Sequence, residues 1–161
     1  MEIRNLIIDT LKKIGFQPGV NKEDVYFKYQ GENFLVCIDG KVSLTIYDTW
    51  WASMDVNDSK IENLKDAINQ TNMSAIPVTL YSINEEKKLL GLHSRYRMFF
   101  TKEMPNKEAL FITVLDSFFS VHQEVKGRFS ALNDVQIENK KKSRVRIRGF
   151  ADIEGNKVED E

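Results

Sequence analysis

The sequence predicts an α+β domain in which helices pack on an antiparallel sheet. Three stretches carry apolar residues at helical spacing, and five runs alternate apolar and polar residues with a period of two. Short turn or capping signals separate most of these segments. The predicted order is α-β-β-β-α-β-β-α, followed by a charged tail.

The first predicted elements are a helix and a three-stranded meander. The helix is expected to end near Gly15, and its apolar stripe comprises Ile3, Leu6, Ile7, Leu11 and Ile14. Residues 17–24 are expected to form a loop. Alternating residues predict strands over 25–30, 34–39 and 42–47, and Asp39-Gly40 is a two-residue hairpin signal between the last two.

A second helix, two strands and a third helix complete the pattern. Ser59 and Glu62 have the spacing of a capping box, with Asn57 or Asp58 as the alternative cap. This helix is expected to end near Asn72, a residue type that tolerates a left-handed stop. Strands follow from Ile76 to Leu80 and from Leu89 to Phe100, and the third helix is predicted between Pro105 and Gly127.

The bulk composition fits one soluble domain. The chain has 161 residues, of which 42% are hydrophobic, and a net charge of −1. Its single cysteine, Cys37, cannot form an internal disulfide and is expected to be a buried, inert thiol. The sequence shows neither a signal peptide nor an apolar run long enough to cross a bilayer. We therefore expect a cytoplasmic protein that does not act at a membrane.

Residue patterns that carry catalysis or bind metals are missing from the sequence. Its two histidines, His93 and His122, and its one cysteine have no zinc-ligand spacing, and no phosphate-binding or nucleophile-elbow motif occurs. His93 is expected to be an ordinary strand residue, and His122 a dipole or packing residue near the end of the third helix. We predict no catalytic residue, no metal and no cofactor, and thus no enzyme.

Aromatic residues are the strongest indication of a binding surface. Trp50-Trp51 is expected at the junction between the third strand and the second helix, with one ring under the helix and the other pointing away. The alternative is that both rings fill the edge of a small core. Tyr26 and Tyr47 fall on the mixed face of the meander. Tyr26, Tyr47, Trp50 and Trp51 are the candidate partner-binding residues.

A basic segment supports a second hypothesis. Residues 140–148 contain six cations and no acid: Lys140, Lys141, Lys142, Arg144, Arg146 and Arg148. They are candidate phosphate contacts of a regulator that binds nucleic acid. The segment nearly lacks aromatics and an acidic stretch follows it, so a solvated tail is favoured and nucleic acid is not the expected partner. Alternation from Arg144 onward would also fit a sixth strand at a sheet edge.

The order of elements resembles the type III secretion chaperone-like fold, and within it the YbjN-type family of proposed bacterial sensory transduction regulators. The likeness covers residues 1–128. It is carried by the opening helix through Phe16, the meander from Val25 to Thr49, the Asn69-x-x-Asn72 helix end and the Phe-rich helix from Pro105 to Val125. Trp50-Trp51 and residues 129–161 lie outside the family pattern. The resemblance implies a non-enzymatic, often dimeric protein whose relatives hold a client polypeptide.

Together these observations predict a chaperone-like domain over residues 1–128 and a charged C-terminal tail over 129–161, either disordered or with one extra edge strand. The predicted function is a non-enzymatic protein-binding or chaperone-like module. It engages a client protein or a second copy of itself through its sheet surface, and a regulatory role is left open.

Overall fold

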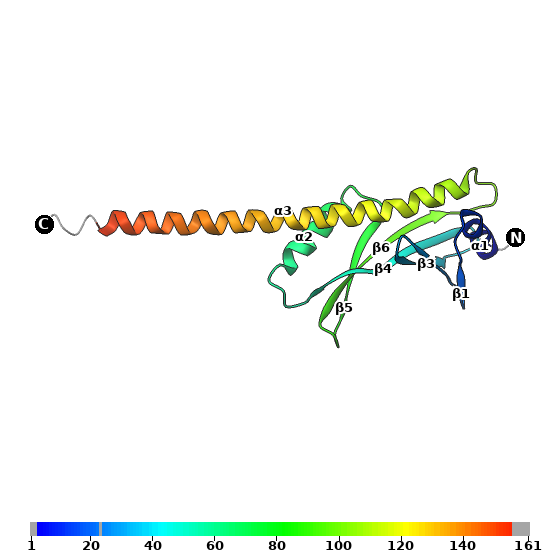
Figure 1. Ribbon diagram of the computed structural model, residues 1–161, viewed down its shortest axis with the longest axis horizontal. Coiled ribbons are helices and arrows are strands. Elements are labelled where there is room, and N and C mark those ends of the chain that lie inside the picture. The colour runs from blue at the N-terminus through cyan, green and yellow to red at the C-terminus, as the bar shows by residue number, and fades with distance from the viewer. Residues whose placement is uncertain (1–2, 23, 156–161) are drawn as a thin grey trace.

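The computed structural model describes residues 3–22 and 24–155, with side chains described as far as residue 135. Within them, helices α1 (Ile3–Ile14), α2 (Ile61–Asn72) and α3 (Lys107–Gly155) accompany one sheet. Its strands are listed in chain order: β1 (Gly19–Asn21), β2 (Asp24–Tyr29), β3 (Glu32–Ile38), β4 (Ser43–Asp55), β5 (Val78–Asn84) and β6 (Leu89–Phe99). All neighbours pair antiparallel, in the order β1-β2-β3-β4-β6-β5 (Figure 1). The predicted α+β class and element order are confirmed.

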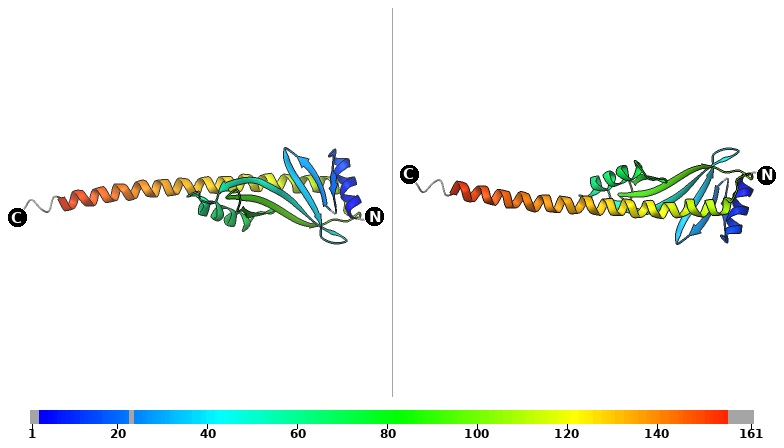
Figure 2. Two further views of the ribbon diagram at one scale, coloured as in Figure 1. Left: turned by 90° about the horizontal axis from the view of Figure 1, so that it is seen from below. Right: turned by 90° about the horizontal axis from the view of Figure 1, so that it is seen from above.

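Two hydrophobic clusters attach the helices to one face of the sheet. The first joins α1 and the start of α3 to strands β2, β3 and β4, with Leu11, Phe34 and Phe118 essentially fully buried. The second joins α2 and the middle of α3 to β6 through Leu64, Leu92 and Val125. Both clusters use the same face, and no helix among the described residues packs on the opposite face, which we call the open face. Figure 2 shows α3 running along the whole length of the sheet.

Three local predictions need correction. Residues 19–21 are not loop but a short edge strand, β1, in which Val20 pairs with Val25. The turn between β3 and β4 spans residues 39–42 rather than two residues, closed by a hydrogen bond from Asp39 N to Ser43 O (3.0 Å). Strand β4 continues to Asp55, well past the predicted end at residue 47, because it pairs with β6 along most of its length.

Both ends of α2 also differ from the prediction. Its N-cap is Lys60, without a side-chain cap bond, so the Ser59–Glu62 capping box does not form. Glu62 instead pairs with Lys65 at 2.7 Å. At the other end Met73 has a right-handed conformation, so Asn72 is not a left-handed stop. The Asn72 amide donates to Thr79 O and accepts from Thr79 N, at 2.8 and 2.9 Å, which ties α2 to β5.

The third helix does not end at Gly127 but continues to Gly155. A glycine weakens a helix by about 1 kcal/mol without ending it unless the backbone adopts a positive φ. Contacts with α2 support the helix past this point, because Phe129 packs on the second cluster and Asn63 donates to Asn133 at 2.7 Å. Residues 129–155 are therefore helical, and the predicted edge strand at 144–148 is wrong.

Candidate protein-binding surface

A single row of residues, one from each strand, crosses the whole open face. The strand register aligns one residue from each strand, and the row reads Gly19, Tyr26, Leu35, Tyr47, Arg95 and Val78. Two predicted site residues, Tyr26 and Tyr47, thus flank Leu35 on the same face. The Tyr26 ring lies over Gly19, where an added Cβ would stand 2.2 Å from the ring. Tyr26 is still half exposed, so the row presents aromatic surface to solvent.

Trp50 extends this aromatic surface from an irregular point of β4. The register between β4 and β6 shifts between Asp48 and Ala52, and Trp50 has a φ of 62°, in the left-handed region. The Trp50 ring covers Gly91, where any Cβ would stand 2.5 Å from it. The backbone N–H of Trp50 donates to Nδ1 of His93 at 3.1 Å. The bulge therefore holds the ring flat on the open face, 40% exposed.

Trp51 points to the helical face and does not belong to this surface. Its ring stacks on His122, with centroids 4.0 Å apart and planes at 16°. Its indole N–H donates to Ser94 Oγ at 3.0 Å. The Trp50-Trp51 pair thus lies inside β4 rather than at a strand-to-helix junction, because the bulge lets the strand continue. Three of the four candidate partner-binding residues share the open face, and the fourth packs under α3.

The sequence reasoning missed a buried pair beneath the bulge, Asp48 and His122. Asp48 is fully buried, His122 is 5% exposed, and their Oδ2 and Nε2 atoms are 3.4 Å apart. Neither Asp48 oxygen, nor His122 Nε2, has a hydrogen-bond partner among the described residues. Burial raises the pKa of Asp48 to about 7 and lowers that of His122 to about 4. Because α3 continues to Gly155, His122 does not lie near a helix end. Of the two roles expected for it, packing is the one found, since its ring stacks on Trp51.

The edge strand β5 is the other unusual part of this surface. It has β6 on one side only, and its residues Val78–Asn84 include no charged side chain. Leu80 pairs with His93, so it lies on the open face, where it is 37% exposed. Tyr81 and Ile83 point to the helical side of the sheet and are 47% and 55% exposed. Natural edge strands are usually blunted by charge, by proline or by short length. The other edge follows that rule, since β1 has three residues.

Cys37 also lies on the open face but offers little chemistry. Burial and the neighbouring carboxylate of Asp24 raise the pKa of its thiol to about 11. A thiolate is the reactive form of cysteine, so the raised pKa agrees with the expected inert thiol. Cys37 is, however, partly rather than fully buried. Within the described residues, no group of three or more histidines, cysteines or carboxylates could hold a metal ion.

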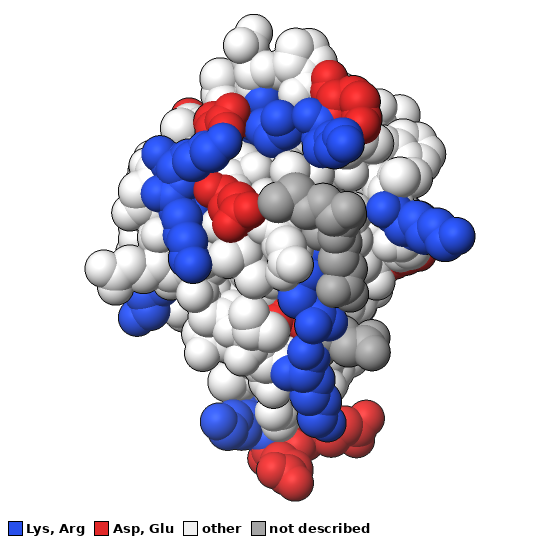
Figure 3. All heavy atoms as spheres, turned by 90° about the vertical axis from the view of Figure 1, so that its right-hand side faces the viewer, with Lys and Arg blue, Asp and Glu red and all other residues white. Residues whose placement is uncertain are grey.

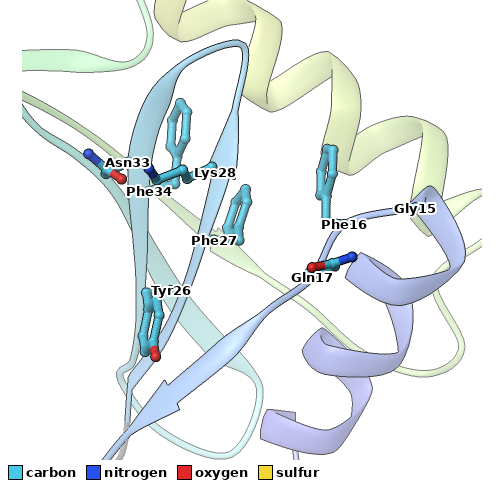
Figure 4. A pocket seen from close by; sticks show the side chains of 8 residues that line it. All are labelled: Gly15, Phe16, Gln17, Tyr26, Phe27, Lys28, Asn33 and Phe34. Atoms are coloured by element: carbon cyan, nitrogen blue, oxygen red, sulfur yellow. The ribbon is translucent and has the colours of Figure 1, made fainter.

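A hollow of about 560 Å³ opens where β1 stops pairing with β2. Phe16 and Phe27 are among the side chains that line it (Figure 4), and their ring centroids are 5.5 Å apart in a stacked arrangement. Phe27 in turn stacks on Phe34 at 5.6 Å. These rings belong to the core, and Tyr26 lies apart from them (Figure 4). The hollow thus opens onto the core, and Tyr26 of the aromatic row forms part of its lining.

The basic segment 140–148 lies in the part of α3 that extends beyond the sheet (Figure 1). The side chains of Lys140, Lys141, Lys142, Arg144, Arg146 and Arg148 lie outside the described residues. At the opposite end of the molecule, which carries α1, basic and acidic side chains are interspersed (Figure 3). That end therefore presents no broad surface of one charge.

Comparison with known proteins gives a fold and little more. No family model matches the chain, and no curated protein matches it. The structure is similar to that of YbjN, a proposed transcription regulator from E. coli, with a TM-score of 0.51 and 9% identity over 83% of this chain and 93% of that chain. An uncharacterized protein from Methanothermobacter thermautotrophicus is also similar, with a TM-score of 0.48 and 12% identity over 78% of this chain and 98% of that chain.

The likeness to YbjN supports the YbjN-like fold that the sequence predicts. At this level of identity it concerns the fold and not the site. In addition, no described helix combines the length and the apolar character that crossing a membrane requires.

Proposed function

We propose that this chain is a non-enzymatic protein-binding module that holds a segment of a partner protein on its open face and along the β5 edge. The observation that carries the proposal is the uncharged edge strand β5, which borders the aromatic open face. Its Leu80 pairs with His93 on that face and is 37% exposed. An extended segment that pairs with such an edge gains backbone hydrogen bonds, and the neighbouring side chains supply specificity. The regulatory description of YbjN agrees with a non-catalytic role.

The test uses the intact chain as bait, followed by binding measurements with the purified partner. A lysine at Ile83 blunts the edge as natural edge strands do, so we expect Ile83→Lys to weaken binding at least tenfold, or about 1.4 kcal/mol. Val135→Lys is a matched control, because Val135 on α3 is 56% exposed and Ile83 is 55% exposed. Equal binding by the wild-type chain and both variants would exclude the β5 edge.

A nucleic-acid-binding regulator is the second candidate function. It is favoured by the position of residues 140–148 on the part of α3 that extends beyond the sheet. Phosphate contacts would make duplex binding fall steeply with salt, and a chain truncated after Asn139 would lose it. Binding that survives this truncation would exclude residues 140–148 as the contact.

A further inference from the structure

A hollow of about 460 Å³ on the open face combines charge with apolar walls. It lies where β4, β6 and the start of β5 meet, next to the chain entering β5. Its apolar walls come from Tyr47, Ile76 and Val78, and its charged groups are Asp39, Arg95 and Arg97. Ile76 is 68% exposed, so this wall is open to a ligand from solvent.

The two arginines of the hollow differ in their partners. Asp39 accepts a hydrogen bond from the Thr45 hydroxyl, and its Oδ2 is 3.7 Å from Nε of Arg97. Arg95 stands between Tyr47 and Val78 in the cross-sheet row. It forms no ion pair with any residue that the structure describes. The hollow therefore holds one guanidinium whose charge is not compensated locally.

This charge pattern selects a class of ligand. Two arginines and one aspartate leave a single positive charge, which a monoanion neutralises. A phosphate dianion would exceed that charge and would lie near the carboxylate of Asp39. A guanidinium fork matches a carboxylate with two parallel hydrogen bonds. The walls formed by Tyr47, Ile76 and Val78 favour an apolar group attached to that carboxylate.

We infer that this hollow binds a carboxylate attached to an apolar group, with Arg95 as the anion-binding residue. Two sources have this chemistry: a free small acid, or an acidic residue next to apolar residues in a polypeptide. In the second case the inference rests on the proposed function and specifies which segments of a partner the open face prefers.

The test is a titration of the full chain followed by NMR, with four probes. Hexanoate represents the free acid and 1-hexanol is its uncharged control. The peptide acetyl-Ile-Glu-Val-amide represents the polypeptide, and its control has glutamine in place of glutamate. We expect a carboxylate probe to shift the amide signals of residues 45–47 and 95–97 saturably, while its uncharged control does not.

Two variants locate the effect. Arg95→Gln should weaken binding at least about tenfold, the value of one charge-assisted hydrogen bond. Lys28→Gln removes an exposed lysine from another part of the sheet and should leave binding unchanged. An unchanged pattern of the remaining amide signals shows that both variants are folded.

The outcomes separate the two sources. Saturation by hexanoate supports a free acid, and saturation by the glutamate peptide alone supports a polypeptide. The inference is overturned if neither carboxylate saturates, if the uncharged controls bind equally well, or if Arg95→Gln binds like the wild type. Ile83→Lys should not alter hexanoate binding, so a failure of the β5 proposal is distinguishable from a failure here.

Discussion

Trp50 and Trp51 are adjacent in sequence but act on opposite faces of β4. Replacing Trp51 with alanine removes the stack on His122 and the hydrogen bond to Ser94. We expect Trp51→Ala to lower the free energy of unfolding by about 3 kcal/mol, as for other large core aromatics. Trp50→Ala should cost about 1 kcal/mol, because this ring covers Gly91 from the solvent side. Urea unfolding at neutral pH measures both values, and a larger loss for Trp50→Ala would contradict this assignment.

The Asp48–His122 pair should make little contribution to the pH dependence of stability. In an unfolded chain, between about pH 4 and 6.5, the histidine is protonated and the aspartate ionised, so the pair binds one proton. In the folded chain the pKa of Asp48 rises to about 7 and that of His122 falls to about 4, so the pair again binds one proton. Because the folded and unfolded states bind the same number of protons, the free energy of unfolding does not change with pH in this range, whichever of the two groups holds the proton.

Single substitutions should reveal the two opposing slopes. In His122→Gln, Asp48 keeps its raised pKa, so the folded state binds one proton more than the unfolded state between about pH 4 and 7. The free energy of unfolding should therefore fall as the pH rises through this range. In Asp48→Asn, His122 keeps its lowered pKa, so the unfolded state binds one proton more than the folded state below about pH 6.5. The free energy of unfolding should therefore fall as the pH drops below this value. Each slope is limited to about 1.4 kcal/mol per pH unit. Urea titrations across this range measure the slopes, and parallel curves for the two variants would refute the account.

At the scale of elements, the part of α3 that packs on α2 should contribute to stability, whereas the part beyond Asn139 should not. Phe129 and the Asn63–Asn133 hydrogen bond lie beyond Gly127 and fix α2 to α3. We expect truncation after Lys126 to lower the melting temperature by several degrees, since a loss of 1 kcal/mol corresponds to roughly 2–4 °C at this chain length. Truncation after Asn139 should leave the melting temperature unchanged. Equal melting temperatures for both truncated chains would show that the α2 contact contributes little.

Strand β5 makes a further prediction about a second copy of the chain. A two-fold pairing of two β5 strands centred on Tyr81 would place Tyr81 beside Tyr81 and Leu80 beside Ser82, with no like charges opposed. In a Cys37→Ser background, Tyr81→Cys should then form a disulfide between two chains, while Ser82→Cys should not. Electrophoresis without reductant measures this. Equal cross-linking at both positions, or none at position 81, would argue against this pairing and leave β5 free for a different protein.

The whole molecule shows which features a sequence pattern predicts well. Alternation such as Val25, Phe27 and Tyr29 identifies strands because it reflects one buried face, and the stripe from Phe111 to Val121 identifies α3 for the same reason. The bulge at Trp50 could not be predicted, because it depends on the register between β4 and β6. The Asp48–His122 pair joins residues far apart in the chain, and the extent of α3 beyond Gly127 depends on contacts with α2. Tertiary contacts decide all three.

The cross-sheet row from Gly19 to Val78 also defines a length. Neighbouring strands lie about 4.8 Å apart, so a row over six strands spans about 24 Å. An extended chain advances about 3.3 Å per residue, and a segment of roughly seven residues would cover the row from one edge to the other. Such a segment would cross the strands instead of pairing with them, so its side chains, and not its backbone, would meet Tyr26, Tyr47 and Arg95. The length of the row thus sets the shortest extended peptide that can contact every strand.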